Sequence, residues 1–265
     1  MFYHAKNKVL SFQGIKMDYI HFGKGVKPLI LIPGLSTERL RGKAFQMAYF
    51  YRLFAKDYQV FLFDRKDEVS EGYTISDMAE EVAQAMSVLH IENADVVGVS
   101  QGGMIAQILA VNYPSLVNKL VLGVTTMKAN DTVYQTIGNW IELAENRDRK
   151  KMVVDMMEKV YSETYISHHR ALIWLMSKFM KVKELDRFII LASSILKFDN
   201  SLDVPQIKCP VFVIGGKEDK VVGGESSLEL ADKLNCDYFI YEKLGHSAYI
   251  ETKDFNKRIL HFLSS

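Results

Sequence analysis

The stretch Val96-Val97-Gly98-Val99-Ser100-Gln101-Gly102-Gly103-Met104-Ile105 joins a short apolar run to a helical pattern. The run at 96–99 is continuous rather than alternating, as in a strand covered on both faces. From Met104 onward, apolar residues recur with helical spacing until Pro114, which cannot continue a helix. The stretch therefore predicts a buried strand, a sharp turn at Ser100 and a helix.

Similar apolar runs recur along the chain and alternate with helical patterns. Two further strands, near 9–12 and 17–22, flank a Gln13-Gly14 turn and predict an antiparallel hairpin at the sheet edge. Thr74 and Asp77 predict a capping box at the start of one helix. We therefore expect an α/β fold with a doubly wound, mostly parallel sheet of eight strands. The other runs lie at 29–32, 60–63, 120–122, 211–214 and 238–241.

The alternation breaks after Val124, where the chain reads as helix without strands. This part is rich in Met, Trp and Phe and nearly lacks glycine. We interpret residues 127–185 as a helical insertion, and residues 1–126 and 186–265 as the core that carries it.

Composition excludes several function classes. The net charge of +1 gives no basic surface for nucleic acid. No stretch approaches the ~18 apolar residues of a membrane span, and the first residues lack a signal-peptide pattern, so we expect a cytoplasmic protein. Cys209 and Cys236 are too few for a disulfide framework and are expected to be reduced. No His, Cys and Glu residues have metal-ligand spacing, so no metal or other cofactor is expected.

Residues 98–102 form a G-x-S-x-G motif, Gly98-Val99-Ser100-Gln101-Gly102. The pattern alone is weak, but here it lies between a predicted strand and a predicted helix, the setting of a nucleophile elbow. The alternative is an ordinary glycine turn. The context favours Ser100 as a nucleophile that a base must activate.

The segment 98–107 resembles the nucleophile region of the α/β-hydrolase superfamily, and the resemblance covers nearly the whole chain outside the insertion. It implies the chain order nucleophile, acid, histidine. His246 follows the run 238–241 in a Leu244-Gly245-His246 loop, which fits the base better than the other histidines do. Asp219 matches the family's position for the acid, and its neighbour Glu218 is the rival.

By the same resemblance, the backbone N–H groups of Leu35 and Gln101 form the oxyanion hole. The chain has Pro33-Gly34 where many relatives have His-Gly. It also has Asp64-Arg65-Lys66-Asp67-Glu68 where the family has Asp-x-Arg-Gly-x-Gly. We expect Asp64 and Arg65 to hold that loop rather than to catalyse.

The resulting hypothesis is a serine hydrolase that cleaves an ester of a small to medium apolar acyl group. A lactone, a thioester or a C–C bond beside a ketone would use the same residues, and an acyltransferase or a non-catalytic ligand receptor remains open. The expected partner is a small-molecule substrate, and a homodimer is left open. Candidate pocket residues, from the oxyanion loop and the insertion, are Ser36, Trp140, Trp174 and Met176.

Overall fold

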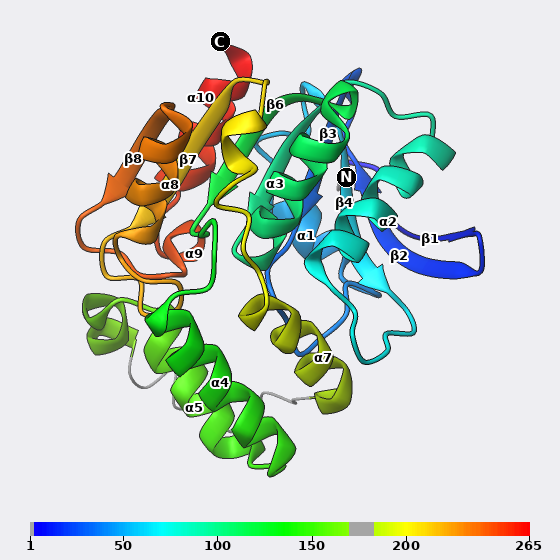
Figure 1. Cartoon of the computed structure of the whole chain (residues 1–265). Coiled ribbons are helices and arrows are strands. Elements are labelled where there is room, and N and C mark those ends of the chain that lie inside the picture. Colours follow the sequence, from blue (N-terminus) through cyan, green and yellow to red (C-terminus); the bar gives the residue numbers. More distant parts are fainter. Residues whose placement is uncertain (1–2, 170–182) are drawn as a thin grey trace.

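The computed structural model describes residues 3–169 and 183–265. In this part of the chain eight strands form one sheet in the order β1-β2-β4-β3-β5-β6-β7-β8 (Figure 1). β2 is antiparallel to both β1 and β4, and the other neighbouring strands are parallel. The predicted fold class and the edge hairpin are confirmed. The strands are β1 (Lys6–Phe12), β2 (Ile15–Phe22), β3 (Lys27–Ile32), β4 (Tyr58–Lys66), β5 (Ala94–Val99), β6 (Val117–Gly123), β7 (Val211–Gly216) and β8 (Asp237–Tyr241).

Helices cover both faces of the sheet. One face packs against α2 (Ile75–Val88), α3 (Gln101–Asn112) and α8 (Ser226–Leu234). The other packs against α1 (Ala44–Phe50) and α10 (Asp254–Ser264). Along β5, Val96 is buried on the first face and Val97 on the second, so the strand is apolar throughout because both faces are covered. The short elements are α9 (Ala248–Glu251), η1 (Pro114–Leu116) and η2 (Val204–Gln206).

α2 begins as the sequence predicts. The Thr74 hydroxyl accepts a hydrogen bond from the Asp77 N–H, and the Asp77 carboxylate accepts one from the Thr74 N–H. This capping box satisfies two N–H groups that the first helical turn leaves unpaired.

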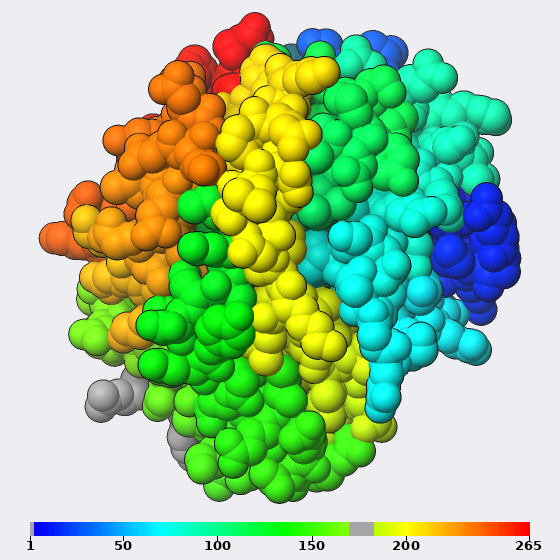
Figure 2. All heavy atoms as spheres, in the orientation of Figure 1, coloured from blue at the N-terminus to red at the C-terminus, as the bar shows by residue number. Residues whose placement is uncertain are grey.

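The helical segment between β6 and β7 lies at the end of the sheet where the elbow is found (Figure 1). It includes α4 (Asp131–Glu145), α5 (Arg149–Val160) and α7 (Leu185–Leu196), and α4 packs against the other two. The stretch that leads into this segment lies beside the stretch that leads out of it. The Ala129 N–H donates to the Phe198 carbonyl, and the Asn200 N–H donates to the Met127 carbonyl. In Figure 2 the yellow residues from α7 onward lie directly against the green helices. The division at residues 127 and 185 stays a prediction.

The helices and the two cysteines were the subject of expectations drawn from composition. None of the helices within the described ranges is both long and apolar enough to cross a lipid bilayer. Cys209 and Cys236 are free thiols, and burial raises the pKa of each to about 11.

Candidate active site

Ser100 lies between the end of β5 and the start of α3, in a conformation that L-residues rarely adopt. Its φ is 55° and its ψ is −123°. The Ser100 N–H donates to the carbonyl of Gly123 on the neighbouring strand β6, and its own carbonyl accepts from the Gly103 N–H and the Thr125 hydroxyl. These bonds hold the strained turn in place and leave the side chain at the carboxyl edge of the sheet.

The glycines around Ser100 are required by close backbone approaches. A Cβ at Gly98 would lie 2.3 Å from the Gly102 carbonyl oxygen, and a Cβ at Gly102 would lie 2.0 Å from the Ile32 carbonyl oxygen. β5, α3 and β3 therefore meet at distances that no side chain permits. A Cβ at Gly34 would lie 3.1 Å from the Ser100 Cβ, so the loop after β3 also reaches the serine.

His246 and Asp219 meet Ser100 in one hydrogen-bonded chain. His246 Nε2 lies 2.9 Å from Ser100 Oγ, and His246 Nδ1 lies 2.7 Å from Asp219 Oδ2. The second Asp219 oxygen accepts the N–H groups of Val221 and Val222 at 2.8 and 3.0 Å. His246 and Asp219 are only 6% and 5% exposed. Three residues far apart in sequence thus form the hydroxyl, imidazole and carboxylate arrangement of a catalytic triad.

The rival carboxylate, Glu218, does not contact this histidine. Its N–H donates to the Leu244 carbonyl, whereas its buried Oε2 has no hydrogen-bond partner among the described residues.

The loop that carries His246 is tied to the end of α5. The Ser247 N–H donates to the Val160 carbonyl at 2.7 Å. Glu251 accepts hydrogen bonds from the N–H of Ser162 at 3.0 Å and from the N–H of Gly245 at 3.3 Å. Sequence reasoning did not find Glu251, because nothing local to it indicates a contact 89 residues away.

Leu35 and Gln101 occupy the two segments that flank the serine. Gln101 is the first residue of α3, where helix N–H groups have no partner within the helix. Leu35 follows Gly34 in the loop after β3. Neither N–H donates a hydrogen bond to any group within residues 3–169 and 183–265.

Comparison with known proteins agrees with this geometry. The family model described as "alpha/beta hydrolase fold" matches residues 27–253. The chain belongs to this family. The match covers the sheet from β3 onward, the helices on both faces except α10, and all three residues of the hydrogen-bonded chain.

Relatives within the α/β-hydrolase family are distant. A RutD protein of Rhizobium rhizogenes, named as a candidate carbamate hydrolase, is 25% identical and covers 79% of this chain and 84% of its own. The 2-hydroxy-6-oxononadienedioate/2-hydroxy-6-oxononatrienedioate hydrolase of Paraburkholderia phymatum is 28% identical. The alignment covers 94% of this chain and 91% of that hydrolase. The solved α/β-hydrolase MGS-M2, from a Medee basin deep-sea metagenome library, aligns with a TM-score of 0.86 at 22% identity. The alignment covers 97% of this chain and 98% of MGS-M2.

A cavity of about 190 Å³ lies beside the elbow of this α/β-hydrolase. Pro33, Gly34 and Gln101 form part of its wall, so it adjoins the segments that flank Ser100. Ser36, one of the predicted pocket residues, also lines it. The remaining lining residues are Glu38, Leu40, Lys43, Met47, Asp64, Arg65, Arg187 and Leu191.

The pocket residues predicted from the helical insertion have different outcomes. Trp140 is not among the described residues that line this cavity. It is 3% exposed on α4, and its indole N–H donates to Asp155 on α5 at 2.8 Å, so it packs the two helices together. Trp174 and Met176 lie outside the described residues. A role for these three side chains in the pocket stays a prediction.

Within the described ranges, no three His, Cys, Asp or Glu side chains gather as metal ligands do.

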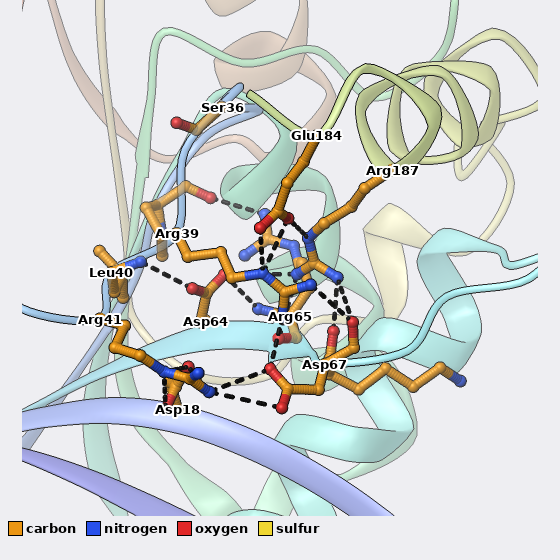
Figure 3. Close-up of polar contacts among 12 residues, drawn as sticks. Asp18, Ser36, Arg39, Leu40, Arg41, Asp64, Arg65, Asp67, Glu184 and Arg187 are labelled. Carbon is orange, nitrogen blue, oxygen red and sulfur yellow. Dashed lines mark hydrogen bonds and ion pairs between the residues drawn. The ribbon is translucent and has the colours of Figure 1, made fainter. Parts of the chain in front are cut away.

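A polar network joins the loop after β3, the loop after β4 and the start of α7 (Figure 3). Arg39 bonds to Asp67 and to Glu184, the residue before α7. Asp64 accepts the Leu40 N–H at 2.8 Å. Asp64 lies within β4 and holds the loop after β3, whereas the sequence placed it in the loop after that strand and expected it to hold that loop.

Asp67 is the acidic centre of this network. Partial burial tends to raise the pKa of its carboxyl, but Arg39, Lys16 and Arg41 outweigh burial and lower the pKa below its ordinary value. A carboxyl with a lowered pKa in the folded state adds stability above its unfolded pKa of about 3.9, and that stability is lost as the pH falls through the folded value.

We expect Asp67→Asn to reduce the free energy of unfolding at pH 7 by about 1 kcal/mol or less, because the ion pairs are partly exposed. The loss should shrink as the pH falls from about 4, where the unfolded state begins to bind the proton, toward the lowered pKa of the folded carboxyl. Urea denaturation of both proteins between pH 7 and pH 3 measures this difference. Asp186→Asn is the matched control, since Asp186 also pairs with an arginine but is 80% exposed. An Asp67 effect that is equal at both ends of the pH range would contradict the expectation.

Proposed function

We propose that this α/β-hydrolase is a serine hydrolase that cleaves a carboxylic ester through an acyl-enzyme. The observation that carries the proposal is the continuous hydrogen-bonded chain from Ser100 Oγ to His246 at 2.9 Å and from His246 to Asp219 at 2.7 Å. A serine hydroxyl becomes a useful nucleophile only when a base accepts its proton, and the base needs a fixed tautomer.

In the proposed reaction, Ser100 Oγ attacks the ester carbonyl while His246 Nε2 accepts the hydroxyl proton. The carbonyl oxygen becomes an oxyanion that accepts hydrogen bonds from the N–H groups of Leu35 and Gln101. His246 then donates the proton to the leaving alcohol, and the C–O bond breaks. Water, deprotonated by His246, attacks the acyl-enzyme and releases the acid and Ser100.

The cavity beside Pro33, Gly34 and Gln101 supports a small acyl group. Its volume of about 190 Å³ lies below the 300–1,000 Å³ typical of sites for drug-sized ligands. Leu40, Met47 and Leu191 contribute apolar side chains to its wall. We therefore propose short-chain esters as the first substrates to test.

Other acyl substrates would use the same residues. The relatives are named for hydrolysis of carbamates, of a dienedioate and, in Acinetobacter baylyi, of an enol-lactone. At identities of 20% to 28%, the substrate of one family member does not identify the substrate of another. Lactones, carbamates and thioesters are therefore alternatives within the same reaction class.

A two-stage experiment tests the proposal. A fluorophosphonate probe should label the wild-type protein and leave Ser100→Ala unlabelled. Hydrolysis of p-nitrophenyl esters of two to eight carbons, of acyl-thioesters, of lactones and of an aryl carbamate should then show the highest kcat/KM for a short ester. Failure to label wild type, while a control hydrolase labels, would overturn the proposed nucleophile. If the probe labels the wild-type protein but only lactones or carbamates are hydrolysed, Ser100 remains the proposed nucleophile and the proposed ester substrate is wrong.

A further inference from the structure

The side chain of Arg65 lies between the two segments that carry the proposed oxyanion-hole donors. It stands near the end of β4 and is 6% exposed. Its Nη2 donates to the Pro33 carbonyl at 2.7 Å and to Gln101 Oε1 at 3.1 Å. Pro33 is two residues before Leu35, and Gln101 carries the second donor on its own backbone. One guanidinium group therefore bonds to both sides of the hole.

The Gln101 side chain extends this connection to α7. Its Nε2 donates to the Leu191 carbonyl at 2.7 Å and to the Ser194 hydroxyl at 3.2 Å. Gln101 is fully buried, and its amide has partners on both sides. The first residue of α3 is thus held between Arg65 in the core and α7 above it.

The backbone of Arg65 is itself held firmly. Its N–H donates to Asp64 Oδ1 at 2.8 Å, and its carbonyl accepts from Arg187 Nη2 at 3.2 Å. Figure 3 shows Asp64 and Arg65 facing the loop of Arg39 and Leu40, with Arg187 reaching in from α7. Residues 64–68, which include the end of β4, lack the glycines of the family pattern, and polar contacts of charged side chains hold this segment instead.

The guanidinium also contributes charge close to the site. Burial lowers the pKa of Arg65 to about 10, which leaves the side chain protonated at neutral pH. Among the described residues, its Nε has no hydrogen-bond partner, and its Nη2 bonds go to neutral oxygens. No carboxylate among the described residues bonds to the guanidinium itself, and the nearby charges of Asp64 and Glu81 offset only part of the effect of burial on its pKa.

We propose that Arg65 is a positioning residue that holds the N–H groups of Leu35 and Gln101 at the separation an oxyanion requires. The inference rests on the proposed function. An oxyanion hole works because its donors are already in place when charge develops, so a group that fixes both donors acts on the transition state more than on the bound substrate. A planar guanidinium suits this role because its nitrogen atoms donate in fixed directions.

The test compares Arg65→Met and Arg65→Lys with wild type, using the p-nitrophenyl ester that wild type hydrolyses fastest. We expect Arg65→Met to lower kcat by about 10²-fold with KM changed by less than about threefold. The Ki of a trifluoromethyl ketone, which forms an oxyanion adduct with the serine, should rise by the same factor as kcat/KM falls. The Ki of the product acid should stay constant. Arg65→Lys should lose less, because it keeps the charge and one donor.

Controls separate positioning from a general structural role. Arg147→Gln removes the exposed ion pair between Arg147 and Asp186 near the start of α7 and should leave all four constants unchanged. Thermal denaturation verifies that each variant is folded. If Arg65→Met does not fold, Arg65→Lys and Gln101→Met provide the same test, because Gln101→Met keeps the backbone N–H but removes the contact with Arg65.

Two results would overturn the inference. The first is a folded Arg65→Met or Gln101→Met enzyme with wild-type kcat/KM. The second is a variant whose kcat falls while the Ki of the trifluoromethyl ketone does not change. An inactive and unlabelled wild-type protein would instead overturn the proposed function, so the two failures are distinguishable.

Discussion

Ser100→Ala is expected to lower kcat by about 10⁶-fold on any ester that the wild-type protein hydrolyses. The variant removes the only atom through which the proposed acyl-enzyme could form, whereas the oxyanion donors remain. A residual rate above that of water should persist for this reason. Single-turnover assays at enzyme concentrations above the substrate concentration measure it. Retention of more than about a hundredth of the wild-type rate would show that another group is the nucleophile.

Stability measurements on the same position separate a catalytic from a structural serine. Alanine keeps the strained backbone at φ 55°, so Ser100→Ala should change the free energy of unfolding by less than about 0.5 kcal/mol. Ser100→Gly should be more stable than Ser100→Ala, because relief of about 1–3 kcal/mol of strain exceeds the ~0.5–1 kcal/mol entropic cost of glycine. If both variants are destabilised by several kcal/mol, the turn depends on the serine hydroxyl for its structure.

Asp219→Asn is expected to lower kcat by about 10⁴-fold while leaving KM nearly unchanged. Asp219 Oδ1 accepts two backbone N–H groups, so an asparagine would place its oxygen there and turn its NH₂ group toward His246 Nδ1. Nδ1 would then have to accept a hydrogen bond, and the imidazole proton would move to Nε2. In that tautomer His246 cannot accept the proton of Ser100.

Glu218→Gln is the matched control for this prediction. It removes the adjacent carboxylate, which has no contact with the histidine, and should keep kcat within about threefold of wild type. Both kcat values come from steady-state hydrolysis of the same p-nitrophenyl ester. Equal losses in the two variants would mean that the acid has not been identified, and a larger loss in Glu218→Gln would assign the role to Glu218.

Much of the site could be predicted from local sequence. The G-x-S-x-G motif between a buried strand and a helix predicted the sharp turn at Ser100, because only glycine fits where a Cβ would lie about 2 Å from a backbone oxygen. The apolar runs predicted the strands, since parallel strands covered on both faces must be apolar throughout. His246 and Asp219 were predicted from the resemblance to the α/β-hydrolase superfamily. In the structure His246 contacts Ser100, and Asp219 contacts His246.

Contacts between distant segments could not be predicted in the same way. The sequence indicated that Asp64 and Arg65 hold a loop, but it did not indicate that Arg65 reaches both Pro33 and Gln101. The sequence offered Trp140 as a candidate pocket residue, but it did not indicate that the indole N–H bonds to Asp155 and joins α4 to α5. A side chain's partner across the fold depends on how elements pack, and no spacing in the chain encodes that packing.

By itself, the sequence determined the order of strands and helices, the position of the sharp turn and the candidate nucleophile, because these depend on periodicity and on steric rules that act within a few residues. The tertiary structure decided that Asp219 rather than Glu218 meets His246, which segments the buried Arg65 joins and which helix lies above Gln101. Those choices depend on the relative placement of segments up to about 150 residues apart, where one hydrogen bond is worth only ~1 kcal/mol and packing of the whole core sets the geometry.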